Sequence, residues 1–347
     1  MKKHSLVFVL LLAGSLILSG CGGEDQSSKA PQESPAASQD STETEEALSR
    51  ETETPPTDET GSDTEPATEP VTEPPTETAF VPVPDGSNGI LTDSGLFPNV
   101  SELSNKSIPY GNDWEAKDEK TGLASGVFWY EAKWGKYFPV YRIKTDKPVV
   151  YLTMDEGYEA GYTPKILDVL KEKNVKAVFF LTKQFVDSDP DLVRRMIAEG
   201  HILGNHTCRH PSGGYPRYVD EHGIDSFVED VSQLHKIVYD RFGYTMRLFR
   251  FPEGESSDML MAKLDNLGYI SVFWSYAHKD YDRNNQPEVS VTLNRCLSHL
   301  GKGAVYLLHA VSESNTEALA DFIDGARERG YEFGVFPVSE VLQPIEH

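Results

Sequence analysis

The sequence predicts an α/β fold in which a parallel sheet is covered by helices. From residue 146 onward, apolar segments typical of buried strands alternate with segments that have a helical pattern. We expect strands at residues 148–153, 176–181, 201–204, 246–250, 269–274 and 303–308, and a last one near 331–336. We expect helices at residues 163–173, 190–199, 226–242, 257–267, 290–300 and 315–329. Six or seven such βα units form either a barrel or an open doubly wound sheet.

Proline and glycine support several of these helix boundaries. Pro164 stands in the opening turn of the first predicted helix, where its missing N–H costs nothing. A glycine follows most of the predicted helices, as is common where a helix ends. These glycines are Gly200, Gly243, Gly268, Gly301 and Gly330.

The charge of the chain argues against nucleic acid as a partner. The 347 residues carry a formal net charge of −23, which repels a phosphate backbone. The segment Glu24–Phe80 holds 16 acidic and 2 basic residues, so most of the charge belongs to a tail and not to the βα domain. We predict no nucleic-acid partner and no protein partner.

The N-terminus resembles a bacterial lipoprotein signal, which we assign to residues 1–21. Lys2 and Lys3 precede an apolar segment at residues 6–18 that is too short for a membrane span. The sequence Leu18-Ser19-Gly20-Cys21 resembles a lipoprotein box, which implies cleavage before Cys21 and lipid attachment to its thiol. An ordinary signal peptide is the alternative. The expected location is the cell membrane, lipid-anchored and facing the cell wall.

Two further segments precede the βα domain, which we place at residues 146–347. Residues 22–85 are rich in Glu, Thr, Ser and Pro and bury too little apolar surface to fold, so we expect a disordered linker. Residues 86–145 are aromatic-rich without clear periodicity, and we expect an irregular extension packed on the βα domain. Core packing is the default role for these aromatic side chains, and carbohydrate stacking is the alternative.

Beyond Cys21, the chain has the cysteines Cys208 and Cys296. One disulfide between them is conceivable, and the spacing does not decide it. We expect two unpaired, small core residues.

Ionisable residues follow most of the predicted strands, at their carboxyl ends. They are Asp155, Glu156, His206, His210, Arg250, Asp280 and His309. Active sites of βα folds are built at this edge of the sheet. Burying an unpaired carboxylate costs several kcal/mol, so adjacent carboxylates after the first strand need a metal, a cation or a proton as a partner. The sequence therefore predicts one polar cleft.

The residues of this cleft suit metal-assisted hydrolysis. His206 and His210 stand four residues apart, a spacing that brings two imidazoles to one divalent ion. Two imidazoles and a carboxylate suit zinc or a similar ion such as cobalt or manganese. Asp155 is expected to accept a proton from water, and His309 to protonate the leaving group, because its ordinary pKa lies near neutrality.

In their order and strand contexts, these residues resemble the NodB-homology polysaccharide deacetylases, carbohydrate esterase family 4. Five motifs carry the resemblance, which covers the whole of residues 146–347. The matching residues are Thr153-Met154-Asp155-Glu156-Gly157, then His206, Thr207 and His210, then Arg250, Pro252 and Gly254, then Asp280, and finally Leu307 and His309. The resemblance implies a distorted (β/α)7-type barrel.

The resemblance also implies roles for individual residues. Asp155 would be the base, and Glu156 would be a metal ligand beside His206 and His210. Asp280 would pair with Arg250 and tune the acid His309, so that Arg250 and Asp280 belong to the catalytic set. Glu156 is one methylene longer than the family's Asp, and either ligates from a shifted backbone or hydrogen-bonds near the metal. Glu253 adds a negative charge that competes with Asp280 for Arg250.

A narrower resemblance is to the delta-lactam-biosynthetic de-N-acetylases. It rests on the segments at 155–159, 161–165, 204–206, 272–275, 284–286 and 306–309. It implies a hydrolase that removes acetyl groups from N-acetylmuramic acid of a peptidoglycan glycan strand. Deacetylation of N-acetylglucosamine in peptidoglycan or another glycan is the first alternative. A catalytically impaired, lipid-anchored cell-wall-binding protein is the second.

Overall fold

The computed structural model describes residues 88–111 and 116–345. The expected signal peptide with Cys21 and the expected linker at residues 22–85 lie outside these residues. Within the described residues, no helix combines the length and the apolar character needed to cross a bilayer. Cys208 and Cys296 are both free thiols, as expected.

The centre of the fold is an eight-stranded sheet in which every pair of strands is parallel. The neighbouring strands run in the order β7-β5-β4-β3-β2-β9-β8, and β10 pairs with the start of β2. The strands of this sheet are β2 (Val149–Glu156), β3 (Ala177–Leu181), β4 (Ile202–Asn205), β5 (Leu248–Phe249), β7 (Ile270–Ser271), β8 (Tyr276–Ala277), β9 (Ala304–His309) and β10 (Glu332–Phe333). A separate antiparallel pair joins β1 (Ile108–Pro109) to β6 (Glu255–Ser256).

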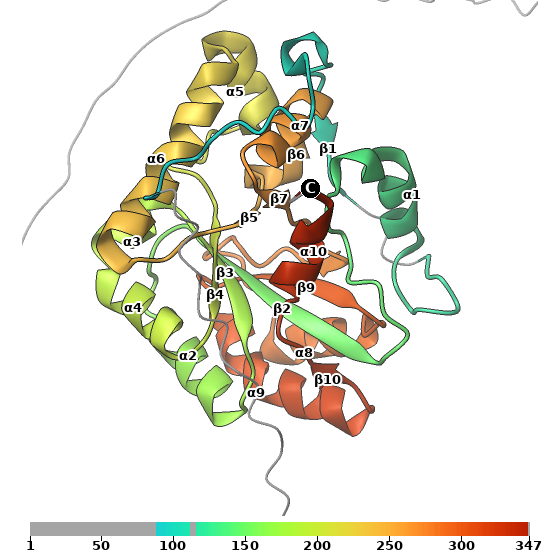
Figure 1. The fold of residues 1–347 in the computed structure, drawn as a ribbon. Coiled ribbons are helices and arrows are strands. Elements are labelled where there is room, and N and C mark those ends of the chain that lie inside the picture. Colours follow the sequence, from blue (N-terminus) through green and yellow to red (C-terminus); the bar gives the residue numbers. More distant parts are fainter. Residues whose placement is uncertain (1–87, 112–115, 346–347) are drawn as a thin grey trace, which may run out of the picture. The chain divides into compact units, whose positions relative to one another are not determined.

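Helices surround this sheet, and α2, α4, α8 and α9 gather along one side of it (Figure 1). The helices are α1 (Ser125–Trp134), α2 (Thr163–Glu172), α3 (Lys183–Ser188), α4 (Pro190–Ala198), α5 (Gly214–His222), α6 (Ile224–Phe242), α7 (Asp258–Asn266), α8 (Val289–Ser298), α9 (Glu313–Glu328) and α10 (Val338–Leu342). The six predicted helices all form, with bounds within two residues of those expected.

The sheet is curled, because its two edge strands are consecutive in the chain. β7 ends at Ser271 and β8 begins at Tyr276, so the link between the edges spans at most about 18 Å. A flat sheet of seven neighbouring strands would separate those edges by about 29 Å. The backbone of Val140 pairs with Val272 beside β7, and that of Arg142 pairs with Ala304 in β9. The prediction of a distorted (β/α)7-type barrel is therefore confirmed, and the open sheet is excluded.

Side chains of β2 alternate between two cores. Val150, Leu152 and Met154 belong to the large core between sheet and helices. Tyr151 belongs to a smaller core inside the curled sheet. Because strand side chains alternate with a period of two, Asp155 faces the interior with Tyr151, and Glu156 faces the helices. This alternation decides what each carboxylate can reach.

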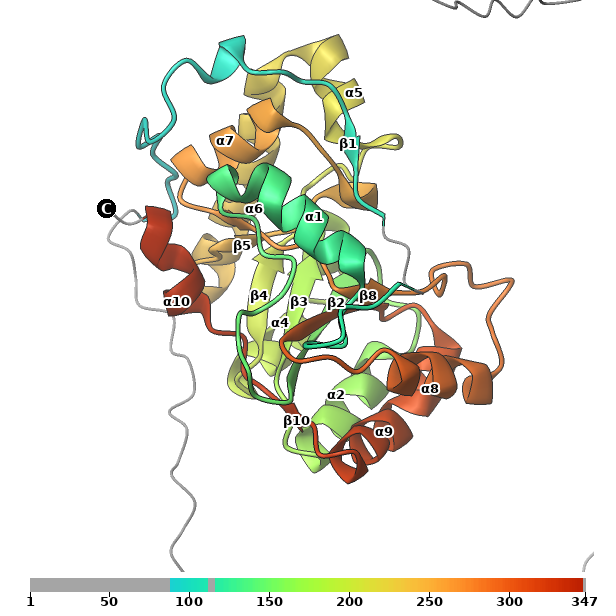
Figure 2. The same ribbon diagram turned by 90° about the vertical axis from the view of Figure 1, so that its right-hand side faces the viewer.

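The N-terminal extension is less irregular than expected. It contains the ten-residue helix α1 and the strand β1. Figure 2 shows α1 and β1 on the same side of the molecule as α7. Extension residues such as Tyr110, Val127 and Trp134 are buried in the large core. Short elements such as β1 escape sequence patterns because a two-residue strand is defined by its pairing partner, here β6.

Candidate active site

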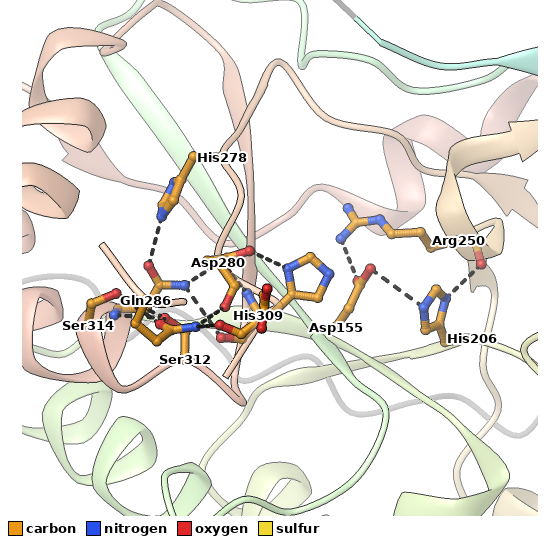
Figure 3. Close-up of polar contacts among 11 residues, drawn as sticks. Asp155, His206, Arg250, His278, Asp280, Gln286, His309, Ser312 and Ser314 are labelled. Carbon is orange, nitrogen blue, oxygen red and sulfur yellow. Dashed lines mark hydrogen bonds and ion pairs between the residues drawn. The ribbon is translucent and has the colours of Figure 1, made fainter. Parts of the chain in front are cut away.

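Asp155 and His309 lie directly opposite each other on the neighbouring strands β2 and β9. Both face the interior of the curled sheet, at the carboxyl ends of the strands. They line a cavity of about 840 Å³ together with His206, His210 and Trp274, among others. Figure 3 shows the His309 ring between Asp280 and Asp155. The cleft expected at this edge of the sheet is present.

Arg250 holds Asp155 in its charged form. Its Nη1 donates to Asp155 Oδ1 at 2.8 Å, and its Nε and Nη2 donate to the carbonyl oxygens of Val272 and Phe273. The guanidinium carbon lies 4.1 Å from the centre of the Phe180 ring. Burial alone would raise the pKa of Asp155, but the charges of Arg250 and the nearby histidines outweigh it and hold the pKa below its ordinary value. Asp155 is therefore a carboxylate near neutral pH.

Asp280 favours the protonated form of His309. Oδ1 of Asp280 accepts a hydrogen bond from His309 Nδ1 at 2.7 Å, and Oδ2 accepts one from the backbone N–H of His309 at 2.9 Å. Burial lowers the pKa of His309, but the charge and hydrogen bond of Asp280 outweigh it, and the pKa lies above its ordinary value. Nδ1–H is bound to Asp280, so Nε2 is the ring atom left to exchange a proton.

The expected pairing of Asp280 with Arg250 was wrong. Arg250 pairs with Asp155, and the carboxylate of Asp280 is occupied by His309 and Asn315. Glu253 was also expected to compete with Asp280 for Arg250, but among the described residues it is not a hydrogen-bond or ion-pair partner of Arg250. Glu253 adopts a left-handed backbone conformation, with a φ of 58°, and its carboxylate accepts the backbone N–H of Gly213.

His206 is oriented as a metal-binding imidazole would be. Its Nδ1 lies 2.9 Å from the carbonyl oxygen of Arg250, which can only accept, so Nδ1 carries the proton and Nε2 keeps its lone pair. Nε2 lies 3.6 Å from Asp155 Oδ2. Burial lowers the pKa of His206 to about 4, so the ring is neutral, which is the form that binds metals.

His210 is brought to His206 by a tight turn after β4. Thr207 and His210 have positive φ values of 76° and 44°, which non-glycine residues adopt rarely. Thr207 Oγ1 accepts the backbone N–H of His210 at 3.0 Å and closes this turn. The centres of the two imidazole rings lie 4.9 Å apart.

Glu156 does not join the two histidines. It faces the helices, is fully buried, and its nearest polar partner is Thr163, whose Oγ1 lies 3.4 Å from Oε2. Burial, followed by the charge of Glu159, raises the pKa of Glu156 well above its ordinary value, so its carboxyl is neutral. Over residues 88–111 and 116–345, no group of three His, Cys, Asp or Glu side chains is arranged to hold an ion. The two imidazoles fit a metal, whereas the third expected ligand does not reach them.

Several polar side chains behind His309 had not been expected in the site. Asn315 Nδ2 donates to Asp280 Oδ2, and its Oδ1 lies 3.1 Å from Nε2 of His278, which lines the cavity. Gln286 Nε2 donates to the backbone carbonyl of Asp280, and its Oε1 accepts from Ser312 and Ser314 (Figure 3). In the sequence, Gln286 belongs to the segment 284–286, which resembles the delta-lactam-biosynthetic de-N-acetylases but implies no role for this residue. Asn315 begins the helix predicted at residues 315–329, and a polar residue is common at the start of a helix, so the sequence does not mark it as a site residue.

Comparisons with known proteins show which sequences and folds this chain is similar to. A family model described as polysaccharide deacetylase matches residues 142–272. The chain is 39% identical over 199 residues to the peptidoglycan-N-acetylmuramic acid deacetylase PdaA of Bacillus subtilis, and the matched segment covers 57% of this chain and 73% of that protein. It is 27% identical over 242 residues to a peptidoglycan-N-acetylglucosamine deacetylase of Bacillus cereus, and the matched segment covers 69% of this chain and 83% of that protein. The solved structure of Bacillus subtilis PdaA, described as a family 4 carbohydrate esterase, matches with a TM-score of 0.63 and 33% identity, over 70% of this chain and 100% of that one.

Proposed function

The chain belongs to the polysaccharide deacetylase family, and from this premise we propose that it removes N-acetyl groups from amino sugars of peptidoglycan, specifically from N-acetylmuramic acid. One observation carries the chemistry. Asp155 and His309 are opposite each other in one cavity, and separate partners favour the ionised form of Asp155 and the protonated form of His309. This is the arrangement that an acid–base pair needs near neutral pH.

The proton transfers follow from these two states. Asp155 takes a proton from the water that attacks the acetyl carbonyl carbon. The carbonyl carbon–nitrogen bond then breaks, and His309 gives its Nε2 proton to the departing amine. The products are acetate and a free amino group on the sugar. Arg250 keeps Asp155 available as the base, and Asp280 keeps His309 available as the acid.

His206 and His210 would hold a divalent metal ion, and zinc is the ion that imidazole pairs commonly bind. Such an ion, when bound, supplies Lewis-acid polarisation of the acetyl carbonyl. The support for this part of the proposal is the Nδ1–H···O=C contact of His206, which directs its Nε2 away from the backbone of Arg250. Metal dependence is to be tested by chelation and reloading of the purified protein.

Arg209 supports the choice of N-acetylmuramic acid. This sugar differs from N-acetylglucosamine by a lactyl group that ends in a carboxylate. Arg209 lines the cavity with a side chain that is 46% exposed, and its Nε is 3.2 Å from Asp230 Oδ2. The remaining guanidinium donors suit a carboxylate of the substrate. The similarity to the Bacillus cereus deacetylase keeps N-acetylglucosamine as the alternative substrate.

The test is hydrolysis of defined peptidoglycan fragments. Purified protein supplied with zinc, cobalt or manganese is expected to release acetate from glycan strands freed of peptide. Mass spectrometry of the fragments should place the lost acetyl group on the muramic sugar. Asp155→Asn and His309→Ala should abolish acetate release while metal content stays unchanged.

Each alternative has its own outcome in this test. Loss of acetyl from glucosamine alone would assign the runner-up substrate. Strand binding without acetate release under all three metals would identify a wall-binding protein and overturn the enzymatic proposal.

The proposed location is the outer face of the cell membrane, through a lipid on Cys21. The support is the sequence Leu18-Ser19-Gly20-Cys21 and the long polar segment that follows it. Metabolic labelling with a fatty acid should mark the protein, and Cys21→Ala should remove the label and release the protein from the membrane fraction.

A further inference from the structure

A second groove lies on the N-terminal extension, outside the cavity of Asp155 and His309. It has a volume of about 390 Å³ and is formed by α1, β1 and the first residue of α7. Its aromatic lining comes from Trp129, Tyr130 and Trp134 of α1, which we call the aromatic platform. The function proposed above makes no use of this groove.

The side chains of the aromatic platform pack on one another, and Trp129 is exposed. Trp129 is 55% exposed, although an indole of this size is normally buried. Its ring packs at 5.0 Å from that of Tyr130 and at 5.5 Å from that of Trp134. Tyr130 Oη donates to the carbonyl oxygen of Pro109 at 2.9 Å, which ties α1 to β1. Core packing explains Trp134, which is buried, but it does not explain the exposed face of Trp129.

The charges around the aromatic platform favour an anionic ligand. Lys133 Nζ lies 4.7 Å from the centre of the Trp129 ring and 4.6 Å from that of Trp134. Lys106 also lines the groove, and both lysines are exposed. Among the described lining residues, Asp258 is the one carboxylate, so the two lysines leave a net positive charge there. The part of the chain outside Glu24–Phe80 is also acidic, because that segment accounts for −14 of the net charge of −23, so a positive groove is distinct from its surroundings in charge.

Tyr110 links a residue of the groove to a residue of the catalytic cavity. Tyr110 Oη donates to the carbonyl oxygen of Trp274, and the Tyr110 ring lies 5.0 Å from the Trp274 ring and 4.7 Å from the Tyr130 ring. Trp274 lines the cavity, and Tyr130 lines the groove. Pro109 of the groove pairs with Glu255, the residue after Gly254 of the cavity. The groove and the cavity are therefore separated by one layer of side chains, a distance that a polymer can span.

We propose that this groove is a distal subsite for the glycan strand, in which Trp129 stacks on a sugar ring and Lys106 and Lys133 bind a sugar-linked carboxylate. A glycan strand freed of peptide offers flat apolar sugar faces and a carboxylate on every muramic residue, which matches an exposed indole and two lysines in one groove. This inference rests on the proposed function, because it takes the same polymer as the ligand of both sites.

The test compares glycan strands of graded length, freed of peptide, on the full chain. In the unchanged protein, KM should fall as the strands become long enough to reach the groove. Trp129→Ala should remove this length dependence and raise KM for long strands about 5- to 10-fold, the size expected for one aromatic contact. The kcat and the KM for the shortest strands should stay unchanged. Trp129→Phe keeps an aromatic face and should retain most of the effect.

Lysine variants test the charge. Lys133→Gln should raise KM for long strands and weaken its dependence on salt. Lys136→Gln is the matched control, because Lys136 lies over Tyr137 in the next turn and does not line the groove. Equal losses in the two variants would argue for a general charge effect and against the subsite.

Binding measurements separate failure of this inference from failure of the proposed function. Co-sedimentation with long strands reports binding without acetate release. Binding that depends on Trp129, without release of acetate, would support the subsite and overturn the enzymatic proposal. Acetate release with the same length dependence in Trp129→Ala as in the unchanged protein would overturn the subsite and leave the enzyme standing.

Discussion

Asp280 contacts His309 twice, once through the ring Nδ1 at 2.7 Å and once through the backbone N–H at 2.9 Å. The carboxylate therefore fixes both the protonation and the position of the acid. The pKa of His309 is raised, so the acid form is present at low pH and is lost as the pH rises through that pKa.

Asp280→Asn removes the charge that raises the pKa of His309. The alkaline limb of the kcat/KM profile should move to lower pH, and kcat should fall by about 10²-fold, within the range attributed to general acid catalysis. The profile is measured by acetate release between about pH 5 and 10. Asp282→Asn, which changes a carboxylate outside the cavity lining, should leave the limb in place. An unmoved alkaline limb in Asp280→Asn would show that His309 is not the group that titrates.

Asn315 should act as a positioning residue for Asp280. Its Nδ2 donates to Asp280 Oδ2, so Asn315→Ala removes one hydrogen bond to a charged group, a loss of about 1.5–3 kcal/mol. We expect kcat to fall by about 10-fold with little change in KM. Asn315→Asp should be more damaging, because it places a second negative charge beside Asp280. Equal activity of the two variants would contradict this role, and thermal unfolding serves as the folding control.

Glu156 should be dispensable for metal binding. It faces the helices and not the two histidines, so Glu156→Gln, which keeps its shape and its contact with Thr163, should bind zinc with an affinity within about 2-fold of the unchanged protein. His206→Ala and His210→Ala should each lower the affinity by at least about 10-fold. Equilibrium dialysis followed by metal analysis measures all three. A large loss of zinc in Glu156→Gln would restore Glu156 as a ligand.

Arg209 should distinguish the two amino sugars. Arg209→Gln should raise KM about 5- to 10-fold for strands that present N-acetylmuramic acid, and leave KM unchanged for N-acetylglucosamine oligomers, which lack the carboxylate. Arg209→Lys should restore part of the effect because it restores the charge. Arg217→Gln is the control, since Arg217 pairs with Glu221 and does not line the cavity. Equal changes on both sugars would remove Arg209 from substrate recognition.

Asp265 should limit the stability of the fold at neutral pH. It is buried in α7, and neither of its carboxylate oxygens has a hydrogen-bond partner. Burial raises its pKa to about 9, so the folded state holds a proton that the unfolded state releases near pH 4. Stability is therefore lost as the pH rises from about 4 to about 9, and the cost at pH 7 is at most about 4 kcal/mol.

Asp265→Asn should remove this pH dependence. At pH 7 the variant should have a higher free energy of unfolding than the unchanged protein, and this difference should shrink towards pH 4. Urea unfolding at several pH values measures the free energy of unfolding of both proteins. A stability difference that is constant with pH would show that Asp265 is not protonated in the fold.

Much of the fold followed from local patterns. Buried parallel strands appear as apolar segments, and helices end at glycine, so the predicted strands and helices correspond to β2–β5, β7, β9 and β10 and to α2, α4, α6, α7, α8 and α9. The nine-residue helix α5 was not predicted. Polar residues at the carboxyl ends of such strands are conspicuous in the sequence, so the sequence alone predicts Asp155, His206, Arg250 and His309 as site residues. Elements defined by distant partners, such as β1 with β6, leave no comparable local pattern.

The sequence did not decide to which face of β2 the Glu156 side chain points. The strand was predicted to end at Thr153, which would leave Asp155 and Glu156 in a turn, where both could reach one metal. β2 instead continues to Glu156, because it pairs with β3 as far as Leu181. Within a strand, adjacent side chains point to opposite faces, so the two carboxylates are separated.

By itself, the sequence determined the family, the order of the strands along the chain and the residues at their carboxyl ends, because these depend on neighbours in the chain. The tertiary structure decided that Arg250 pairs with Asp155, that Asp280 serves His309, and that Trp129 faces a groove beside the cavity. Arg250 and Asp155 are 95 residues apart in the chain, and Asp280 and His309 are 29 apart. Which side chains meet across such separations depends on strand register and on the curl of the sheet.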